Sequence, residues 1–305
     1  MKISVIVATC NRSQAIIPCL DSIHQSLKAA APLDAEIVVV DNASKDDTPE
    51  VLKKWAARSE FPVNLEYEKR KGAAVARNRG IRASRGDILV CTDDDCRLSE
   101  NHIKDVIRHD SHDSGPVLRG GRVELGNPDD LPITIKTSRD STRWSKHTHF
   151  AKNANYLDTK HGCNIIIGCN IAMRRTAAKR IGVFDERFGP GTRLPGADDT
   201  DFAYRAYLAG VTLEYVPDMV MFHFHGRKSK GDGYKLMKNY MISTGGLYAK
   251  YLFRHPNFCR HFYWDLRQAV QEVRAGKSSF MPEIGFSFKK KVAYNLLGAM
   301  RYYFG

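Results

Sequence analysis

Three consecutive carboxylates, Asp93, Asp94 and Asp95, follow an apolar run at residues 88–90. Ionised groups this close together repel one another, and burying them without a partner is costly. A bound cation removes that cost, and carboxylate oxygens favour hard ions such as Mg²⁺ or Mn²⁺, which commonly also bind phosphate. We therefore interpret Asp93 and Asp95 as ligands of a divalent metal that would hold a nucleotide diphosphate. The alternative is an exposed Asp-rich turn.

The elements that must position these carboxylates are strands that alternate with helices. Each strand is a nearly continuous apolar run, which is typical of a parallel sheet covered by helices on both faces. We therefore expect an α/β fold with a Rossmann-like, mostly parallel central sheet. The expected strands are residues 2–8, 35–40, 63–67 and 88–92, and the expected helices are residues 13–27, 72–83 and segments that begin near residues 48 and 99.

Polar residues follow the end of every one of these strands. They are Thr9 and Asn11, then Asp41 and Asn42, then Arg70 and Lys71, and finally the three aspartates. The carboxyl ends of parallel strands share one edge, where open α/β sheets bind their ligands. This convergence predicts a nucleotide site. The sequence has neither a G-x-G-x-x-G nor a Walker A pattern, which argues against dehydrogenases and P-loop enzymes.

After residue 114 the pattern becomes less regular. Residues 117–123 predict a strand interrupted by a glycine pair, residues 201–208 predict a helix, and residues 212–216 and 220–225 predict two further strands. Residues 125–160 are polar without a clear period, and we interpret them as a variable region on the acceptor side. A glycine-rich stretch at residues 189–196 precedes a second acidic cluster at residues 198–201.

Charge is distributed unevenly along the 305 residues. Residues 226–305 contain fifteen Lys and Arg against four Asp and Glu, so +11 of the net charge of +13 lies there. Three helices are expected in this part, at residues 234–254 with an interruption at Gly245 and Gly246, at 261–274 and at 288–304. Basic helices rich in aromatic residues suit an anionic membrane surface. The alternative is a helical subdomain that packs on the core with a solvated basic face.

The overall composition is that of a globular protein, with 43% hydrophobic and 27% charged residues. No stretch approaches the roughly 18 apolar residues of a membrane span. The seven cysteines include no C-x-x-C pair and predict neither a disulfide framework nor a zinc site. We expect a cytoplasmic protein that attaches peripherally to the inner face of the cell membrane.

Taken in order, these segments resemble family-2 glycosyltransferases of the GT-A fold. The resemblance covers residues 2–225 and depends on the order and spacing of several motifs, because each alone is weak. The motifs are residues 4–12, 37–44, 72–81, 92–95, 168–174, 182–188 and 198–205. It implies a catalytic domain at residues 1–225, with a nucleotide-sugar half (1–115) and an acceptor half (116–225). Residues 226–305 are then a basic helical extension.

The resemblance implies inverting transfer of a sugar from a nucleotide-diphospho-sugar, expected to be a UDP-sugar, to a hydroxyl of a glycan or lipid-linked acceptor. Asp41 would accept the N3–H of the base, or would only form an Asx turn. Arg77 would meet phosphate or orient the carboxylates, unless it is an ordinary helix-surface arginine. The complete donor-side set is Ala8, Thr9, Asn11, Arg12, Asp41, Asn42, Gly72, Arg77, Asp93 and Asp94.

On the acceptor side, the family's usual Glu-Asp pair is replaced by Asp198 and Asp199. Asp199 would be the general base, while Asp198 would bind the acceptor or be the base itself. The alternative is that these carboxylates only stabilise a helix start. His223 and His225 would add metal ligands beside Asp95, or would be ordinary histidines. Residues 226–233 would form a lid over the diphosphate, or a solvated linker.

Two other function classes remain open at this point. A nucleotidyltransferase that makes sugar nucleotides also uses an α/β sheet and carboxylates, but usually needs a glycine-rich phosphate loop near its N-terminus. A nucleic-acid-binding protein has only the charge in its favour, and we expect no nucleic-acid partner. The glycosyltransferase interpretation makes a spatial prediction, that Asp41, Asp95 and Asp199 line one cavity.

Overall fold

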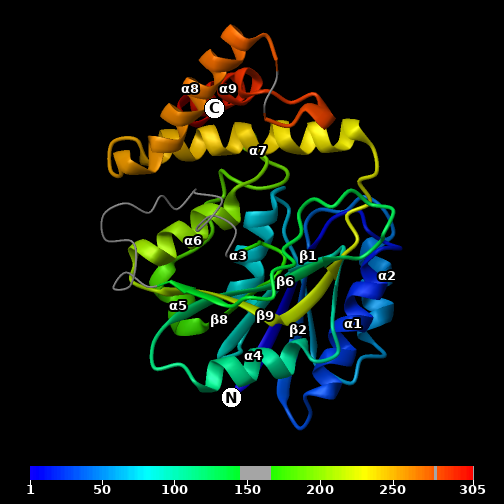
Figure 1. Cartoon of the computed structure of the whole chain (residues 1–305). Helices are drawn as coiled ribbons and strands as arrows, with labels where there is room; N and C mark the ends of the chain where they lie inside the picture. The colour runs from blue at the N-terminus through cyan, green and yellow to red at the C-terminus, as the bar shows by residue number, and fades with distance from the viewer. Residues whose placement is uncertain (145–165, 278–279, 305) are drawn as a thin grey trace.

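A computed structural model describes residues 1–144, 166–277 and 280–304. One mixed, mostly parallel sheet lies between helices, and a layer of three C-terminal helices lies across one end of it (Figure 1). The strands are β1 (Lys2–Thr9), β2 (Asp34–Asp41), β3 (Val63–Tyr67), β4 (Ile88–Asp93), β5 (Cys96–Leu98), β6 (Val117–Leu125), β7 (Thr142–Trp144), β8 (Ile171–Arg174) and β9 (Thr212–His223). The four strands expected in the first 92 residues are all present, within two residues of their expected ends.

The strand order is β3-β2-β1-β4-β8-β6-β9-β5, and β7 pairs with β9. The first four strands are mutually parallel, while β8 is antiparallel to both β4 and β6. In the register, Thr9 pairs with Asp41 and Ala8 pairs with Asp93. The ends of β1, β2 and β4 are therefore level, which brings their polar residues to one edge as predicted.

One face of the sheet is covered by three helices, α1 (Ile16–Ala29), α2 (Thr48–Ala56) and α4 (His102–Ser111). Their apolar side chains form one core with every second residue of the strands, for example Val5 and Val39. The other face is covered by α3 (Ala73–Ala83), α5 (Arg175–Ile181) and α6 (Asp198–Leu208). These helices form a second core with the strand residues between those of the first, for example Ile6 and Val40. Successive strand residues point to opposite faces, so a strand buried on both sides must be apolar throughout.

Residues 212–225 do not form two strands as the sequence predicted. Strand β9 runs without a break from Thr212 to His223, and its pairing with β6 skips from Val216 to Val220 opposite Gly121 and Arg122. A Cβ at Gly121 would collide with the backbone oxygen of Met219 and the amide of Asn170. The glycine pair therefore accommodates an irregularity in the neighbouring strand rather than interrupting β6.

The C-terminal layer comprises α7 (Lys230–Tyr251), α8 (Arg260–Ala275) and α9 (Phe288–Phe304), with 3₁₀ turns at Pro256–Cys259 and Pro282–Ile284. The sequence predicted a break at Gly245 and Gly246, but α7 continues through both. Helix α9 crosses at this point, and a Cβ at Gly245 would overlap the backbone of Asn295. The glycines allow close helix contact, and the packing compensates for their low helix propensity.

Helix α7 packs on the α/β core. Its residues Ile242 and Leu247 lie in the same apolar cluster as Phe184, which follows α5. Lys250 forms ion pairs with Asp185, at 2.8 Å, and with the buried Asp201. For α7, the alternative of a packed helical subdomain is therefore the right one. No helix in the described part of the chain is both long and apolar enough to cross a membrane.

Candidate active site

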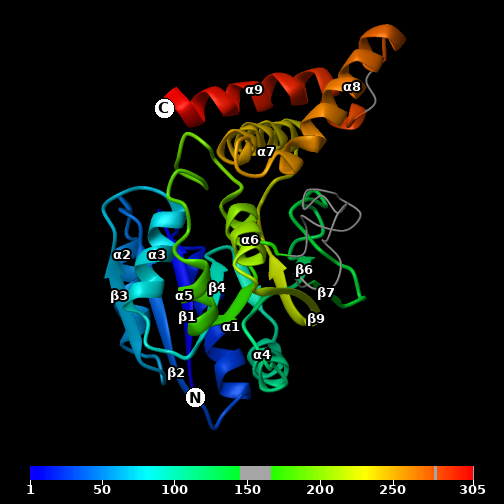
Figure 2. The same ribbon diagram turned by 90° about the vertical axis from the view of Figure 1, so that its left-hand side faces the viewer.

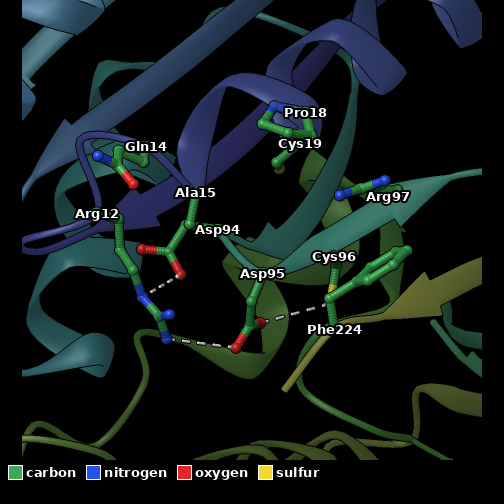
Figure 3. Close-up of a pocket in the computed structure, with 10 residues that line it drawn as sticks. All are labelled: Arg12, Gln14, Ala15, Pro18, Cys19, Asp94, Asp95, Cys96, Arg97 and Phe224. Atoms are coloured by element: carbon green, nitrogen blue, oxygen red, sulfur yellow. Dashed lines mark hydrogen bonds and ion pairs between the residues drawn. The ribbon is translucent and has the colours of Figure 1, made fainter. Parts of the chain in front are cut away.

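The turns that follow β1 and β2 are hydrogen-bonded to each other. Asn11 adopts a left-handed conformation (φ 55°), and its Oδ1 accepts the Lys45 N–H at 2.7 Å. The N–H groups of Asn11 and Arg12 donate to the hydroxyls of Ser44 and Thr48, both at 2.9 Å. These contacts fix the backbone at the start of the site. The side chain of Arg12 extends from it towards the carboxylates (Figure 3).

Asp94 turns back towards β1. Its Oδ2 accepts the Thr9 hydroxyl at 2.7 Å, and its Oδ1 lies 3.5 Å from Arg12 Nε. Burial raises the pKa of Asp94 to about 6, against the opposing effects of Thr9 and Arg12. Of the three aspartates, Asp94 thus serves to hold the loop against β1.

Asp95 faces His223 at the end of β9. The His223 Nε2 lies 3.3 Å from Asp95 Oδ1, and Arg12 Nη2 lies 3.4 Å from Asp95 Oδ2. Burial alone would lower the pKa of His223, but the hydrogen bond with Asp95 outweighs it and raises the pKa to about 9. The same contact lowers the pKa of Asp95 despite its burial. The contact brings a carboxylate oxygen and an imidazole nitrogen together, and both are ligand types that divalent ions accept.

His225 is directed elsewhere. Its Nε2 lies 3.1 Å from the Leu131 oxygen, and its Nδ1 accepts the Arg227 N–H at 3.0 Å. The first contact requires a proton on Nε2 and the second a lone pair on Nδ1, so the ring is neutral. Burial lowers its pKa accordingly. These contacts give His225 a structural role in the loop, and His223 is the histidine that contacts Asp95.

Arg77 on α3 joins the two acidic clusters. Its Nη2 donates to Asp93 Oδ1 at 2.5 Å, and its Nη1 donates to Asp198 Oδ2. The side chain is buried, and the two carboxylates raise its pKa although burial acts in the opposite direction. The sequence left three roles open for Arg77. These contacts correspond to the one in which Arg77 orients the carboxylates.

The acidic pair at the start of α6 divides into a buried and a more accessible member. Asp198 is 5% exposed, and burial raises its pKa despite Arg77. It packs against Gly189, where a Cβ would lie 3.0 Å from its carboxyl carbon. Asp199 is half-buried, and its oxygens accept the N–H groups of Gly168 at 2.9 Å and Thr200 at 2.7 Å. Asp199 therefore also serves the helix start.

Asp41 and Asn42 position the neighbouring loops. The Oδ1 of Asp41 accepts the Ser44 N–H at 3.0 Å, so the Asx-type turn is present. The Asn42 amide donates to the oxygens of Glu68 and Arg70 and accepts the N–H of Gly72 at 2.8 Å. Gly72 has φ 142° and is the N-cap residue directly before α3. Asn42 thus affects the site indirectly, by holding the backbone of residues 68–72 in position.

A pocket of about 270 Å³ opens beside Asp94 and Asp95 (Figure 3). Its wall is completed by the start of α1 and by Arg97, whose guanidinium carbon lies 3.8 Å from the centre of the Phe224 ring. Asp41 and Asp199 do not line this pocket, so it does not meet the prediction of one cavity shared with Asp95. The donor-side and acceptor-side carboxylates are connected instead through Arg77.

Four further residues belong to the surroundings of the site although the sequence analysis did not single them out. Tyr240 places α7 beside the loop that leads into the acidic pair, because a Cβ at Gly196 would lie 3.3 Å from its ring. The charge of Arg227 contributes to lowering the pKa of Asp95, and its Nη1 is buried without a hydrogen-bond partner among the described residues. Cys96 and Cys169 bring their sulfur atoms within 4.8 Å of a His223 ring nitrogen. Only Arg227 had a sequence signal, its place directly after the two histidines.

Comparison with known proteins shows similarity in sequence and in fold. The family model "Glycosyl transferase family 2" matches residues 4–182. Glycosyltransferase AglE of Haloferax volcanii is 25% identical over 243 residues, which are 80% of this chain and 72% of that protein.

Two solved structures share the fold at 19% sequence identity. Staphylococcus aureus TarS, whose structure with UDP-GlcNAc is known, has a TM-score of 0.55 over 89% of this chain and 77% of its own. Mannosyltransferase PcManGT of Pyrobaculum calidifontis, solved with GDP-Man and Mn²⁺, has a TM-score of 0.59 over 99% and 87%. The predicted α/β architecture is thereby confirmed.

Proposed function

Because the chain belongs to glycosyltransferase family 2, we propose that it transfers a sugar from a nucleotide-diphospho-sugar to a hydroxyl of a glycan or lipid-linked acceptor, with inversion. The donor we propose is a UDP-sugar, with Asp41 at the end of β2 accepting the N3–H of uracil. One Asp41 oxygen is used by Ser44, and the second is the acceptor for the base.

The donor-side residues fit a divalent metal, Mn²⁺ or Mg²⁺. Asp95 and His223 would hold it, and Asp93 would face it or the ribose. Asp95 and His223 present an oxygen and a nitrogen 3.3 Å apart, a donor pair suited to such an ion. When bound, the ion would neutralise the negative charge that develops on the departing diphosphate. Arg12, 3.4 Å from Asp95, supplies a fixed positive charge at the same place.

On the acceptor side, Asp199 is the proposed general base. The acceptor oxygen attacks the anomeric carbon, its proton passes to an Asp199 oxygen, and the bond to the diphosphate oxygen breaks with its electron pair. The Gly168 and Thr200 N–H groups hold the Asp199 carboxylate in position. Asp198 is buried in contact with Arg77 and Gly189. Its proposed role is therefore to position Arg77 rather than to accept the proton.

The observation that carries this proposal is the double contact of Arg77. It links Asp93, at the donor end of β4, to Asp198, the direct neighbour of the proposed base. Ion pairs that only stabilise the fold can be fully buried, whereas Asp93 and Asp199 are both partly exposed to solvent and could therefore contact a substrate. The arrangement therefore favours transfer between a bound donor and an adjacent acceptor.

A donor screen with Mn²⁺ present tests the proposal. The purified chain is incubated with UDP-, GDP- and dTDP-sugars, and release of the nucleoside diphosphate is measured without an acceptor and with glycan or lipid-linked acceptors. We expect release from UDP-sugars above the rate in EDTA. Formation of pyrophosphate from a sugar phosphate and a nucleoside triphosphate would support a nucleotidyltransferase instead.

The role of Asp199 is tested with Asp199→Asn. This variant should bind donor normally, measured by calorimetry, and lose roughly 10²- to 10⁴-fold in turnover. The matched control is Asp34→Asn, whose parent carboxylate is 69% exposed at the start of β2, the opposite end of that strand from Asp41. Turnover by Asp199→Asn at the rate of the control would reassign the base.

A further inference from the structure

Helix α8 is amphipathic, and it turns its polar side inwards. Its two acidic residues, Asp265 and Glu272, are 1% and 3% exposed. Asp265 Oδ1 lies 2.8 Å from Lys291 Nζ, and Glu272 Oε2 accepts the Lys289 N–H at 3.1 Å, so both face α9. Charged side chains are rarely buried without partners, and both of these carboxylates have a partner on α9. The acidic side of α8 is therefore part of the contact between α8 and α9.

The opposite side of α8 is apolar and open to solvent. Tyr263, Leu266, Val270 and Val273 are 72%, 44%, 44% and 64% exposed. Their spacing of three and four residues places them along one stripe of the helix. Monomeric proteins rarely leave so regular an apolar stripe uncovered, and such a stripe marks an interaction surface.

A row of arginines runs beside this stripe. Arg260, Arg267 and Arg274 are separated by seven residues each, so they lie on one line along the helix, and all three are exposed. The outward face of α8 contains no acidic residue, because both acidic residues of the helix face α9. An apolar stripe with a basic border matches the surface of a bilayer that contains anionic lipid.

The position of α8 in the molecule leaves this face accessible. Helix α7 packs on the catalytic core, and α8 lies on the side of α7 that is turned away from the sheet (Figure 2). Helix α9, which packs against α8, adds exposed Leu296, Met300 and Phe304 and the basic residues Lys289 and Lys290.

We propose that the outward face of α8, defined by Tyr263, Leu266, Arg267, Val270, Val273 and Arg274, binds an anionic phospholipid surface and holds the enzyme on it. A second copy of the chain is a poorer occupant, because pairing two of these faces would oppose two rows of arginines without acidic partners. The proposal is independent of the sugar-transfer function, since α8 contributes no residue to the candidate active site.

The test uses the full-length chain, because deleting residues 226–305 would remove α7 from the core. Flotation with vesicles compares phosphatidylcholine alone with phosphatidylcholine mixed with phosphatidylglycerol, without donor or metal. We expect binding only to the anionic vesicles, and weaker binding as NaCl is raised. Of the three tryptophans, all in the described residues, only Trp264 is exposed, so binding should shift its fluorescence to the blue.

Two variants separate the apolar and basic contributions. Leu266→Ser/Val270→Ser/Val273→Ser should abolish binding, and Arg267→Gln/Arg274→Gln should weaken partitioning roughly 30-fold. The charge-matched control Lys53→Gln/Lys54→Gln, exposed on α2, should bind like the wild type. All substituted residues are exposed, so the melting temperatures should change little.

Equal flotation of the wild type and both α8 variants would overturn the proposal, as would the absence of binding to anionic vesicles. If light scattering shows a dimer that the serine variant dissociates, and no vesicle binding occurs, the face is an interface between copies. A failed donor screen with normal vesicle binding would refute only the proposed function.

Discussion

Arg77 and Asp198 form a buried ion pair across 121 residues of sequence. Arg77 lies on α3, which follows the third strand, and Asp198 opens α6, which begins after the glycine-rich loop. The second hydrogen bond of Arg77, to Asp93, makes this arginine the structural link between the two halves of the candidate site.

Removing Arg77 should therefore destabilise the protein strongly. Arg77→Met leaves the buried carboxylate of Asp198 without its partner, and we expect a loss of about 3–5 kcal/mol in unfolding free energy, measured by urea denaturation. The matched control is Arg79→Met on the same helix, whose ion pair with Glu66 is 45% exposed on the arginine side. It should cost less than about 1 kcal/mol. Equal losses in the two variants would contradict this role.

Metal binding should depend on Asp95 and not on its neighbour Asp94. Asp95→Asn removes the carboxylate that faces His223 and should weaken Mn²⁺ binding by at least roughly 10- to 100-fold, measured by electron paramagnetic resonance. Asp94→Asn keeps an acceptor for the Thr9 hydroxyl and should retain the affinity. If both variants bind Mn²⁺ as the wild type does, the metal site lies elsewhere.

Acid should destabilise the fold through His102. Burial lowers its pKa from 6.5 to about 4, against the hydrogen bond to Asn170. The unfolded state then binds more protons between these values, so stability present above pH 6.5 is lost as the pH falls towards 4. His102→Gln should reduce the loss of unfolding free energy between about pH 7 and about pH 4.5 by about 2 kcal/mol or more.

The control for this prediction is His112→Gln, at the exposed end of the same helix, α4. It should follow the wild-type pH dependence. An unchanged acid slope in the His102 variant would show that the fold accommodates the protonated imidazole.

The crossing of α7 and α9 should not tolerate a methyl group at Gly245. A Cβ there would overlap the backbone of Asn295, which cannot move independently of α9. Gly245→Ala should lower the unfolding free energy by about 1–3 kcal/mol in thermal melts, despite the better helix propensity of alanine. In Gly231→Ala, in the first turn of α7, the nearest neighbour of the new Cβ lies at 3.5 Å, so this control should be neutral or stabilising. Two stabilised variants would mean that α9 packs less closely.

The sequence by itself determined the first four strands of the sheet. The central residues of β1, β2 and β4 are nearly all apolar, which is typical of strands buried on both faces, and the ends of these strands predicted where Asp41 and Asp93 would lie. It also predicted α9 with its observed bounds, because residues 288–304 contain no proline and only one glycine, Gly298. The spacing of apolar residues was sufficient to predict an element wherever that element's own residues decide whether it is a helix or a strand.

Only the tertiary structure decided which polar groups meet. Arg77, Asp198 and Lys250 are distant in sequence, and nothing in their local patterns indicates that Arg77 pairs with Asp198 or Lys250 with Asp201. The continuity of α7 through its two glycines likewise depends on α9, which contacts it there. A side chain's partner is set by the packing of whole elements, whereas a strand or helix records its environment in its own spacing of apolar residues.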